Sequence, residues 1–236
     1  FIIVLSYINK QYIITLWKRN LQRLPEEKYR WIYEENPYGQ ATCLLAKDMK
    51  QDSIVGAIAL FPRRVLINGK NHMAALSGDF AVNKEHRVLV PALLLQNAAI
   101  SKCNEGQFEF SYGIPNEESK SISLSVGSKE LNYNMFVKPL KAEYKSKKYL
   151  PPATYTKKFS KIIDFGLKVF PKENRYRRPS YISVEMPDTF DERFDAFWSK
   201  VSQQFRIIFE RNARFLTWRY KQFPYKNYEI FLLVND

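Results

Sequence analysis

The chain has 236 residues, of which 45% are hydrophobic and 26% are charged, a composition typical of a folded globular protein and not of a disordered one. Its 37 lysine and arginine residues outnumber 24 aspartate and glutamate residues, and the resulting net charge of +13 favours anionic partners. Charge alone does not choose among nucleic acid, an acidic membrane surface and phosphorylated small molecules. The longest apolar run, residues 88–95, is much shorter than the ~20 residues of a bilayer span, so no transmembrane segment is predicted.

The two cysteines, Cys43 and Cys103, stand in apolar segments without a CxxC pair or a Cys/His cluster. The sequence therefore predicts buried thiols, no disulfide framework, no metal site and a cytoplasmic location. The chain starts Phe-Ile-Ile-Val, without an initiator methionine or the basic region of a signal peptide, which indicates a trimmed or partial chain.

Helices are predicted first, followed by an antiparallel meander. Apolar residues recur at helical spacing over residues 9–20, which predicts a first helix. Pro25, followed by two glutamates, is typical of the start of a second helix, which ends near residue 36. The strands that follow are predicted over residues 41–47, 54–66 and 73–82, with a tight turn at Asn68-Gly69 between the last two.

After residue 82 helices and strands alternate. Residues 88–102 have the length and apolar spacing of a helix, with Pro91 tolerated in its first turn. A strand over 108–114, a helix over 116–126 and a strand over 132–140 complete the order ααβββαβαβ, which is a mixed α/β layout with one central sheet.

Residues 141–180 are rich in lysine, tyrosine and proline and mark a domain boundary. Within them residues 155–170 predict an amphipathic helix, for which two interpretations stay open: a helix on a membrane surface, or a linker helix packed on a domain.

The spacing W-x-Y-x3-P-Y occurs twice, at Trp31 and at Trp218, 187 positions apart. Each occurrence follows a helix with another tryptophan, Trp17 or Trp198, and leads into an apolar strand. We interpret this as a duplicated domain. The predicted parts are a first domain over residues 1–140, a basic linker over 141–180 and the first part of a second, similar domain over 181–236.

The residues around the helix predicted over 88–102 carry a recognisable pattern. Gly78-Asp79-Phe80-Ala81-Val82 ends a strand, Arg87-Val88-Leu89-Val90-Pro91-Ala92 enters the helix, and Asn116, Ser119 and Gly127 follow at regular spacing. In this order the residues resemble the GNAT (Gcn5-related) N-acetyltransferases and, with the repeated W-x-Y helix end, their bacterial two-domain members. The resemblance covers roughly residues 9–140 and, more faintly, 181–236. It implies a mainly antiparallel central sheet flanked by helices.

The resemblance also implies acetyl-CoA, or a similar acyl-CoA, as co-substrate. A helix N-terminus offers unpaired amides and partial positive charge, so a pyrophosphate fits there without charged side chains. The residues expected to bind the co-substrate are Ala81, Val82, Arg87, Val88, Leu89, Val90, Pro91, Ala92 and Asn116. For Arg87 a plain exposed arginine, and for Asn116 a simple helix cap, are the alternatives.

Catalysis by such a domain is direct attack of an amine on the acyl thioester. The backbone N–H near Val82 is expected to stabilise the oxyanion, and Asp79 is the candidate general base. The alternative for Asp79 is a salt bridge to a neighbouring element. Ser123 stands where relatives carry a tyrosine that protonates the leaving thiolate, and Val90 stands where they usually carry glycine.

These features predict an N-acyltransferase that acts on a small or sugar-linked amine. The substitutions at Val90 and Ser123 motivate the alternative of a non-catalytic binding or scaffolding module with a degenerate pocket. Nucleic-acid binding has only the net charge in its favour, because the sequence contains no recognisable nucleic-acid motif. The sequence predicts neither the acyl acceptor nor the oligomeric state.

Overall fold

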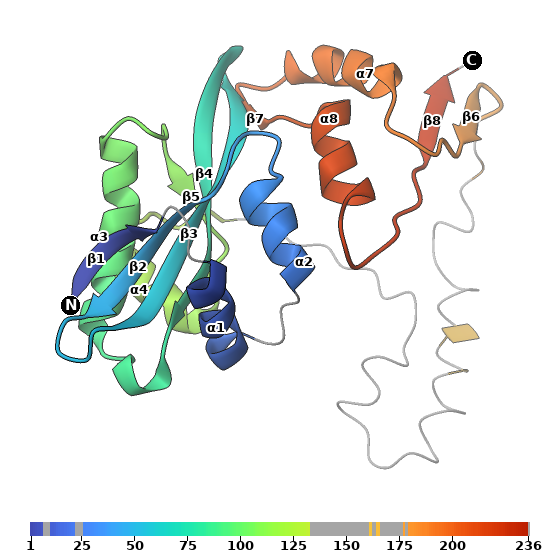
Figure 1. Ribbon diagram of the computed structural model, residues 1–236. Coiled ribbons are helices and arrows are strands. Elements are labelled where there is room, and N and C mark those ends of the chain that lie inside the picture. The colour runs from blue at the N-terminus through green and yellow to red at the C-terminus, as the bar shows by residue number, and fades with distance from the viewer. Residues whose placement is uncertain are drawn as a thin grey trace. The chain divides into compact units, whose positions relative to one another are not determined.

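The computed structural model describes residues 1–6, 10–21, 26–132, 161, 164–165, 177 and 179–235 (Figure 1). The chain divides into two compact units, the first formed by residues 1–130 and 187–230 and the second by residues 131–186 and 231–236. The strand predicted over 132–140 and the helix predicted over 155–170 lie almost wholly outside the described residues.

The first unit is built on a six-stranded sheet in the order β1-β2-β3-β4-β5, with β7 pairing with β3 beside this path. All neighbours are antiparallel except β4 and β5, which are parallel. The sheet confirms the predicted mixed, mainly antiparallel α/β fold. Its strands are β1 Ile2–Ser6, β2 Thr42–Asp48, β3 Ser53–Ile67, β4 Lys70–Val82, β5 Ser111–Tyr112 and β7 Ile207–Phe209.

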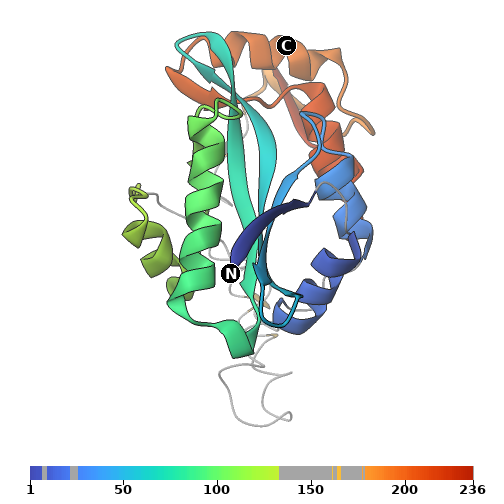
Figure 2. The ribbon, with the colours of Figure 1, turned by 60° about the vertical axis from the view of Figure 1, so that its left-hand side comes forward.

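Helices cover both faces of this sheet (Figure 2). On one face, Trp17 and Tyr33 pack against Phe61 of β3 in one apolar core. On the other face, Leu95 packs against Ile58 in a second core. The first face carries α1 Lys10–Asn20, α2 Glu26–Tyr29 and the π-helix η1 Arg30–Glu34, and the second carries α3 Leu89–Asn104 and α4 Glu117–Ser125.

The β3–β4 hairpin turns at the predicted dipeptide. Asn68 and Gly69 have φ angles of 50° and 76°, which is the left-handed pair that a two-residue turn between antiparallel strands requires. The turn thus fixes the register in which the two longest strands present the residues of the site.

Two expectations about the strands were wrong. The chain was expected to open with helices, but Ile2–Ser6 form β1, which pairs with Cys43–Lys47 of β2. Five successive apolar or small residues lack the alternation of an edge strand, and their partner lies some forty positions away. The strand expected over 108–114 is reduced to Ser111–Tyr112, although the backbone N–H of Glu109 still donates to the carbonyl of Met73 and that of Ala75 to the carbonyl of Phe110.

The later part of the chain repeats the order of elements found at its start. Strand, helix, short helix, π-helix and strand follow one another in both segments, and in both the two strands pair antiparallel. In the second segment these elements are β6 Ile182–Glu185, α7 Glu192–Ser202, α8 Ala213–Leu216, η4 Thr217–Lys221 and β8 Leu232–Asn235, with β7 inserted before α8.

The two W-x-Y segments contact each other in the first unit. Both are π-helices that continue a four-residue α-helix, a conformation that is rare in proteins. The indole of Trp31 stacks on that of Trp218 with ring centroids 4.6 Å apart and planes at 13°. Each indole Nε1–H donates to the backbone carbonyl of the other tryptophan, at 2.8 and 2.9 Å. The two hydrogen bonds are therefore reciprocal.

Flanking contacts follow the same reciprocity. Tyr38 stacks on Phe215, and the Tyr225 side chain is hydrogen-bonded to the backbone of Lys28. Residues 28 and 215 are 187 positions apart, as are residues 38 and 225 and the two tryptophans. A contact in which residue i meets j′ and j meets i′ has the form of a two-fold symmetric interface.

Replacing either tryptophan is expected to destabilise the first unit strongly. Trp31→Ala and Trp218→Ala should each lower the free energy of unfolding by about 3–5 kcal/mol, because each removes a buried ring and leaves a carbonyl without its donor. The double variant should lose less than the two losses added, with about 0.5–3 kcal/mol of coupling, measured by urea denaturation.

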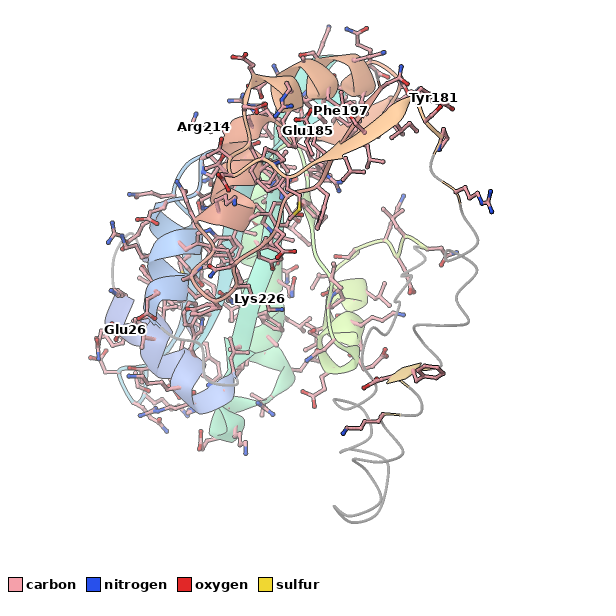
Figure 3. The ribbon with its side chains drawn as sticks, turned by 90° about the vertical axis from the view of Figure 1, so that its right-hand side faces the viewer. Glu26, Tyr181, Glu185, Phe197, Arg214 and Lys226 are labelled. Carbon is pink, nitrogen blue, oxygen red and sulfur yellow. The ribbon has the colours of Figure 1, made fainter. Side chains whose placement is uncertain are left out.

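Phe197 is the control for this cycle. It lies on α7, is labelled in Figure 3 and is 66% exposed, so Phe197→Ala should change stability by no more than about 0.5 kcal/mol. Additive losses at Trp31 and Trp218 would show that the two rings do not act as one contact.

Candidate active site

Asp79 occupies the extra position of a β-bulge in β4. Ala81 pairs with Ala57 and Gly78 pairs with Ala59, so that Asp79 and Phe80 together face the single residue between them on β3. Asp79 has a φ of +48°, a left-handed conformation that favours glycine. A non-glycine residue held in this way costs about 1–3 kcal/mol and often marks a functional position.

The Asp79 carboxylate has two partners from the helices on the first face. The hydroxyl of Tyr33 donates to its Oδ2 at 3.1 Å, and Lys28 Nζ lies 3.6 Å from its Oδ1. Burial and then the negative charge of Asp79 raise the pKa of Tyr33 well above its ordinary value. The salt bridge foreseen as an alternative is therefore present, and the role of Asp79 as general base stays a prediction.

Beside the bulge the sheet opens. β5 pairs with β4 only at Ala75 and Leu76, whereas β4 continues to Val82. Gly113 still lies close to β4, since a Cβ there would stand 3.2 Å from the carbonyl oxygen of Ser77. Beyond that point no strand within the described ranges pairs with this edge of β4, so its backbone groups are left for a ligand or water.

A cavity of about 400 Å³ lies along this open edge. Its walls come from the end of β4, the entry to α3, the first turns of α4 and the last turn of α1. Seven of the nine residues expected to bind the co-substrate line it: Ala81, Val82, Arg87, Val88, Leu89, Ala92 and Asn116.

The N-terminus of α3 is free of side-chain caps. Val88 is the N-cap residue and makes no capping hydrogen bond, so the amides of Leu89 and Val90 have no intrahelical acceptor. Val90 is 53% exposed and is not among the cavity walls, so its side chain does not narrow the cavity. Pro91 is fully buried and anchors the first turn in the core.

Two polar side chains on the cavity wall are held in place by their neighbours. Arg87 Nε donates to the carbonyl of Val82 at 3.3 Å, which ties the entry of α3 to the end of β4. Asn116 Oδ1 accepts the backbone N–H of Ser119 at 2.9 Å and therefore caps α4, as its alternative interpretation expected. Ser123 Oγ donates to the carbonyl of Ser119 at 3.0 Å and does not line the cavity.

Six further residues line the cavity that the sequence did not single out for it. Asn20 shows why, because it reaches the site only through packing of α1 on β4, where its Nδ2 donates to Oδ1 of the buried Asn83 at 2.8 Å. Ser119 did have a signal, since it falls within the pattern that begins at Asn116. The six are Asn20, Leu21, Phe80, Glu118, Ser119 and Ile122.

In the part of the chain that the structure describes, no three histidine, cysteine, aspartate or glutamate side chains gather. The two histidines pair singly with carboxylates, His72 with Glu109 at 2.7 Å and His86 with Asp48 at 3.4 Å. Among the same residues, no helix combines the length and the apolarity that crossing a membrane would take.

Residues 8–121 match the family model described as an acetyltransferase (GNAT) domain. This part of the chain is a GNAT acetyltransferase domain. The match contains the end of β4 and the entry to α3, which line the cavity, and also Asp79 of the bulge, which is not among the cavity walls. The family resemblance predicted from the sequence is thus confirmed, whereas the two-domain form stays a prediction.

Solved structures with similar folds carry acetyltransferase names. The GNAT domain is similar to glucosamine-6-phosphate N-acetyltransferase from Arabidopsis thaliana, with 12% identity, a TM-score of 0.46, and coverage of 58% of this chain and 99% of the other. It is also similar to ribosomal-protein-alanine N-acetyltransferase from Brucella melitensis biovar Abortus 2308, with 15% identity, a TM-score of 0.45, and coverage of 59% and 99%. No curated protein matches the chain.

The strain at the bulge predicts an unusual order of stabilities. Asp79→Ala and Asp79→Gly both lose the contacts to Tyr33 and Lys28, but only glycine relaxes at a φ of +48°. Asp79→Gly should therefore be more stable than Asp79→Ala by about 1 kcal/mol in urea denaturation. Equal stabilities, or a more stable alanine variant, would contradict a strained left-handed residue at this position.

Proposed function

We propose that this GNAT domain transfers an acyl group from acetyl-CoA, or a similar acyl-CoA, to an amine. The observation that carries the proposal is the cavity in which the uncapped N-terminus of α3 meets the open edge of β4. Either feature alone is common. Their meeting in one cavity supplies a place for a diphosphate and, beside it, backbone groups for an extended amide-containing arm.

The residues around the cavity fit an acyl-CoA. The amides of Leu89 and Val90 are directed by the helix start toward an anion, and Arg87 adds a positive charge at the same entry. Phe80 and Ala81 on the open edge of β4 would contact the pantetheine arm, whose amides pair with backbone groups as a strand does. The net charge of +13 favours the approach of such an anion.

In the proposed reaction the amine nitrogen attacks the acyl carbonyl carbon, the bond from carbon to sulfur breaks, and an amide forms. Asp79 takes the proton that the amine loses, with Tyr33 and Lys28 orienting its carboxylate. A backbone N–H next to the bulge stabilises the oxyanion. The departing thiolate takes a proton from solvent or from another group, because the Ser123 hydroxyl is engaged with its own helix.

We also propose that the chain is a tandem of related domains, as the sequence suggested, with 181–236 opening the second. The repeated element order and the reciprocal contact of Trp31 and Trp218 support this proposal. We further propose that the acceptor is a small or sugar-linked amine. The proposed location is cytoplasmic, where free thiols such as Cys43 persist.

Binding of acyl-CoA should raise the melting temperature, because a ligand held by the native state alone stabilises it by mass action. We expect a shift with acetyl-CoA at millimolar concentration, and Arg87→Ala should weaken affinity about tenfold by removing a charged contact. Arg30→Ala is the matched control, since Arg30 is 72% exposed and pairs with Glu35 away from the cavity walls. No shift for the native protein would overturn the proposal.

Turnover should depend on Asp79 separately from binding. Asp79→Asn keeps the size of the side chain and one acceptor oxygen but removes the base, so the rate of acyl transfer should fall about 100-fold or more. Acetyl-CoA affinity, measured by calorimetry, should change little. An asparagine variant with unchanged turnover would exclude Asp79 as the base.

The second candidate function is a binding module that retains acyl-CoA without transferring the acyl group. The position of Ser123, outside the cavity walls and bonded to its own helix, favours it, since the cavity then lacks the acid expected there. Calorimetric binding without turnover over a panel of amines would establish this alternative.

A further inference from the structure

Lys28 of α2 holds a primary amine beside the candidate general base. Its Nζ atom lies 3.6 Å from Oδ1 of Asp79, whose other carboxylate oxygen accepts the hydroxyl of Tyr33. A base that takes the proton of an attacking amine has to lie near that nitrogen, and such contacts are often long in unliganded enzymes. The amine of Lys28 therefore lies where the proposed reaction needs the amine of the acceptor.

Neighbouring groups hold this amine in place. The Nζ atom of Lys28 lies 5.5 Å from the ring centroid of Trp17, an arrangement that attracts a cation. The backbone of Lys28 is hydrogen-bonded to the side chain of Tyr225. The side chain of Lys28 is 21% exposed and that of Asp79 is 13% exposed, so the pair is shielded from most of the solvent. A ring, a carboxylate and a backbone contact thus fix the amine at the base.

The pair also lies next to the wall of the cavity. Phe80, which follows Asp79 on β4, lines the cavity. Leu21, the residue after α1, lines it as well and packs against the core that contains Trp17. The cavity proposed for the acyl-CoA and the surroundings of Lys28 therefore share a boundary at the ends of β4 and α1.

We propose that Lys28 is itself an acyl acceptor, modified at Nζ by the acyl-CoA bound to the same chain. This inference rests on the proposed acyl transfer and names a modification site for it. The unprotonated Nζ attacks the carbonyl carbon of the thioester, the bond from carbon to sulfur breaks, and an amide forms on Lys28. Asp79 takes the proton that the nitrogen loses, and the thiolate of CoA leaves and takes a proton from solvent.

Acylation of Lys28 changes the site in two ways. The amide carries no charge, so Asp79 loses the cation beside it and Trp17 loses the cation over its ring. The acyl group also stays where the amine of a free acceptor is proposed to lie. Free amines therefore compete with Lys28, and an excess of amine should slow its modification.

Lys10 of α1 is a matched control. Its Nζ atom lies 5.7 Å from the ring centroid of Tyr29 and 4.0 Å from a carboxylate, that of Glu26. It thus has an aromatic and an acidic neighbour as Lys28 does, but its carboxylate is not the candidate base. The side chain of Lys10 is also more exposed, 45% against 21%, so acylation that follows access to the reagent alone favours Lys10.

The test incubates the full chain with acetyl-CoA and no added amine. Peptide mass spectrometry should show acetylation of Lys28 at least about tenfold faster than that of Lys10, at a rate independent of protein concentration, because the transfer occurs within one chain. Acetyl phosphate, an acyl donor without the pantetheine arm, should abolish this preference. Equal rates at the two lysines, the same preference with both donors, or a rate proportional to protein concentration would overturn the inference.

Variants separate the nucleophile from the base. By intact mass, Lys28→Arg, which keeps a positive charge beside Asp79, should lose the first acetyl group that the chain acquires, and Lys10→Arg should keep it. Asp79→Asn should slow acetylation of Lys28 about 100-fold and leave that of Lys10 unchanged. Unchanged acetylation of Lys28 in Asp79→Asn would contradict the proposal. The comparison of the two donors uses the native chain alone and so does not depend on the folding of a variant.

Failure of this inference is distinguishable from failure of the proposed function. A protein that binds acetyl-CoA and acylates free amines while Lys28 stays unmodified would overturn the self-acylation alone. A melting temperature that does not respond to acetyl-CoA would overturn both. Acetylation of Lys28 without turnover of free amines would support the inference, with Lys28 as the acceptor.

Discussion

The site depends on the parting of β5 from β4. Backbone hydrogen bonds join residues 109–112 to β4 between Met73 and Leu76, and from there to Val82 this edge of β4 has no partner strand within the described residues. Backbone groups on a strand edge need partners, and the cavity leaves space beside this edge for the proposed co-substrate. The bulge at Asp79 lies within this unaccompanied stretch and redirects one side chain toward the helices of the opposite face. One interruption of the sheet thus creates both the ligand edge and the position of the candidate base.

Local features of the fold were predictable from the sequence because they depend on local chemistry. Asn68-Gly69 specified its turn, and apolar spacing specified α1 and α3. β1 was not predictable in this way, because its strand character comes from pairing with β2 across forty residues. The bulge likewise has no local signature, since Asp79 is strained only by the register of the neighbouring strand.

The residues of the candidate site likewise fall into those that a local pattern identifies and those that only tertiary packing brings there. Residues next to one another in the pattern, such as Arg87 and Leu89, were identified because the helix start is a local feature. Asn20 and Ile122 reach the cavity through packing of separate helices, and no spacing in the sequence reports such contacts.

The reciprocal contact between Trp31 and Trp218 affects the order in which the protein folds during synthesis. The indole of Trp31 can be covered by Trp218, and its carbonyl satisfied, only after residue 218 has been synthesised, and β3 can pair with β7 only after residue 209. During translation the ring of Trp31 therefore stays uncovered by Trp218 while most of the chain is synthesised. Contacts of such long sequence separation slow folding, so the segment after residue 186 also determines when the first unit can complete its fold.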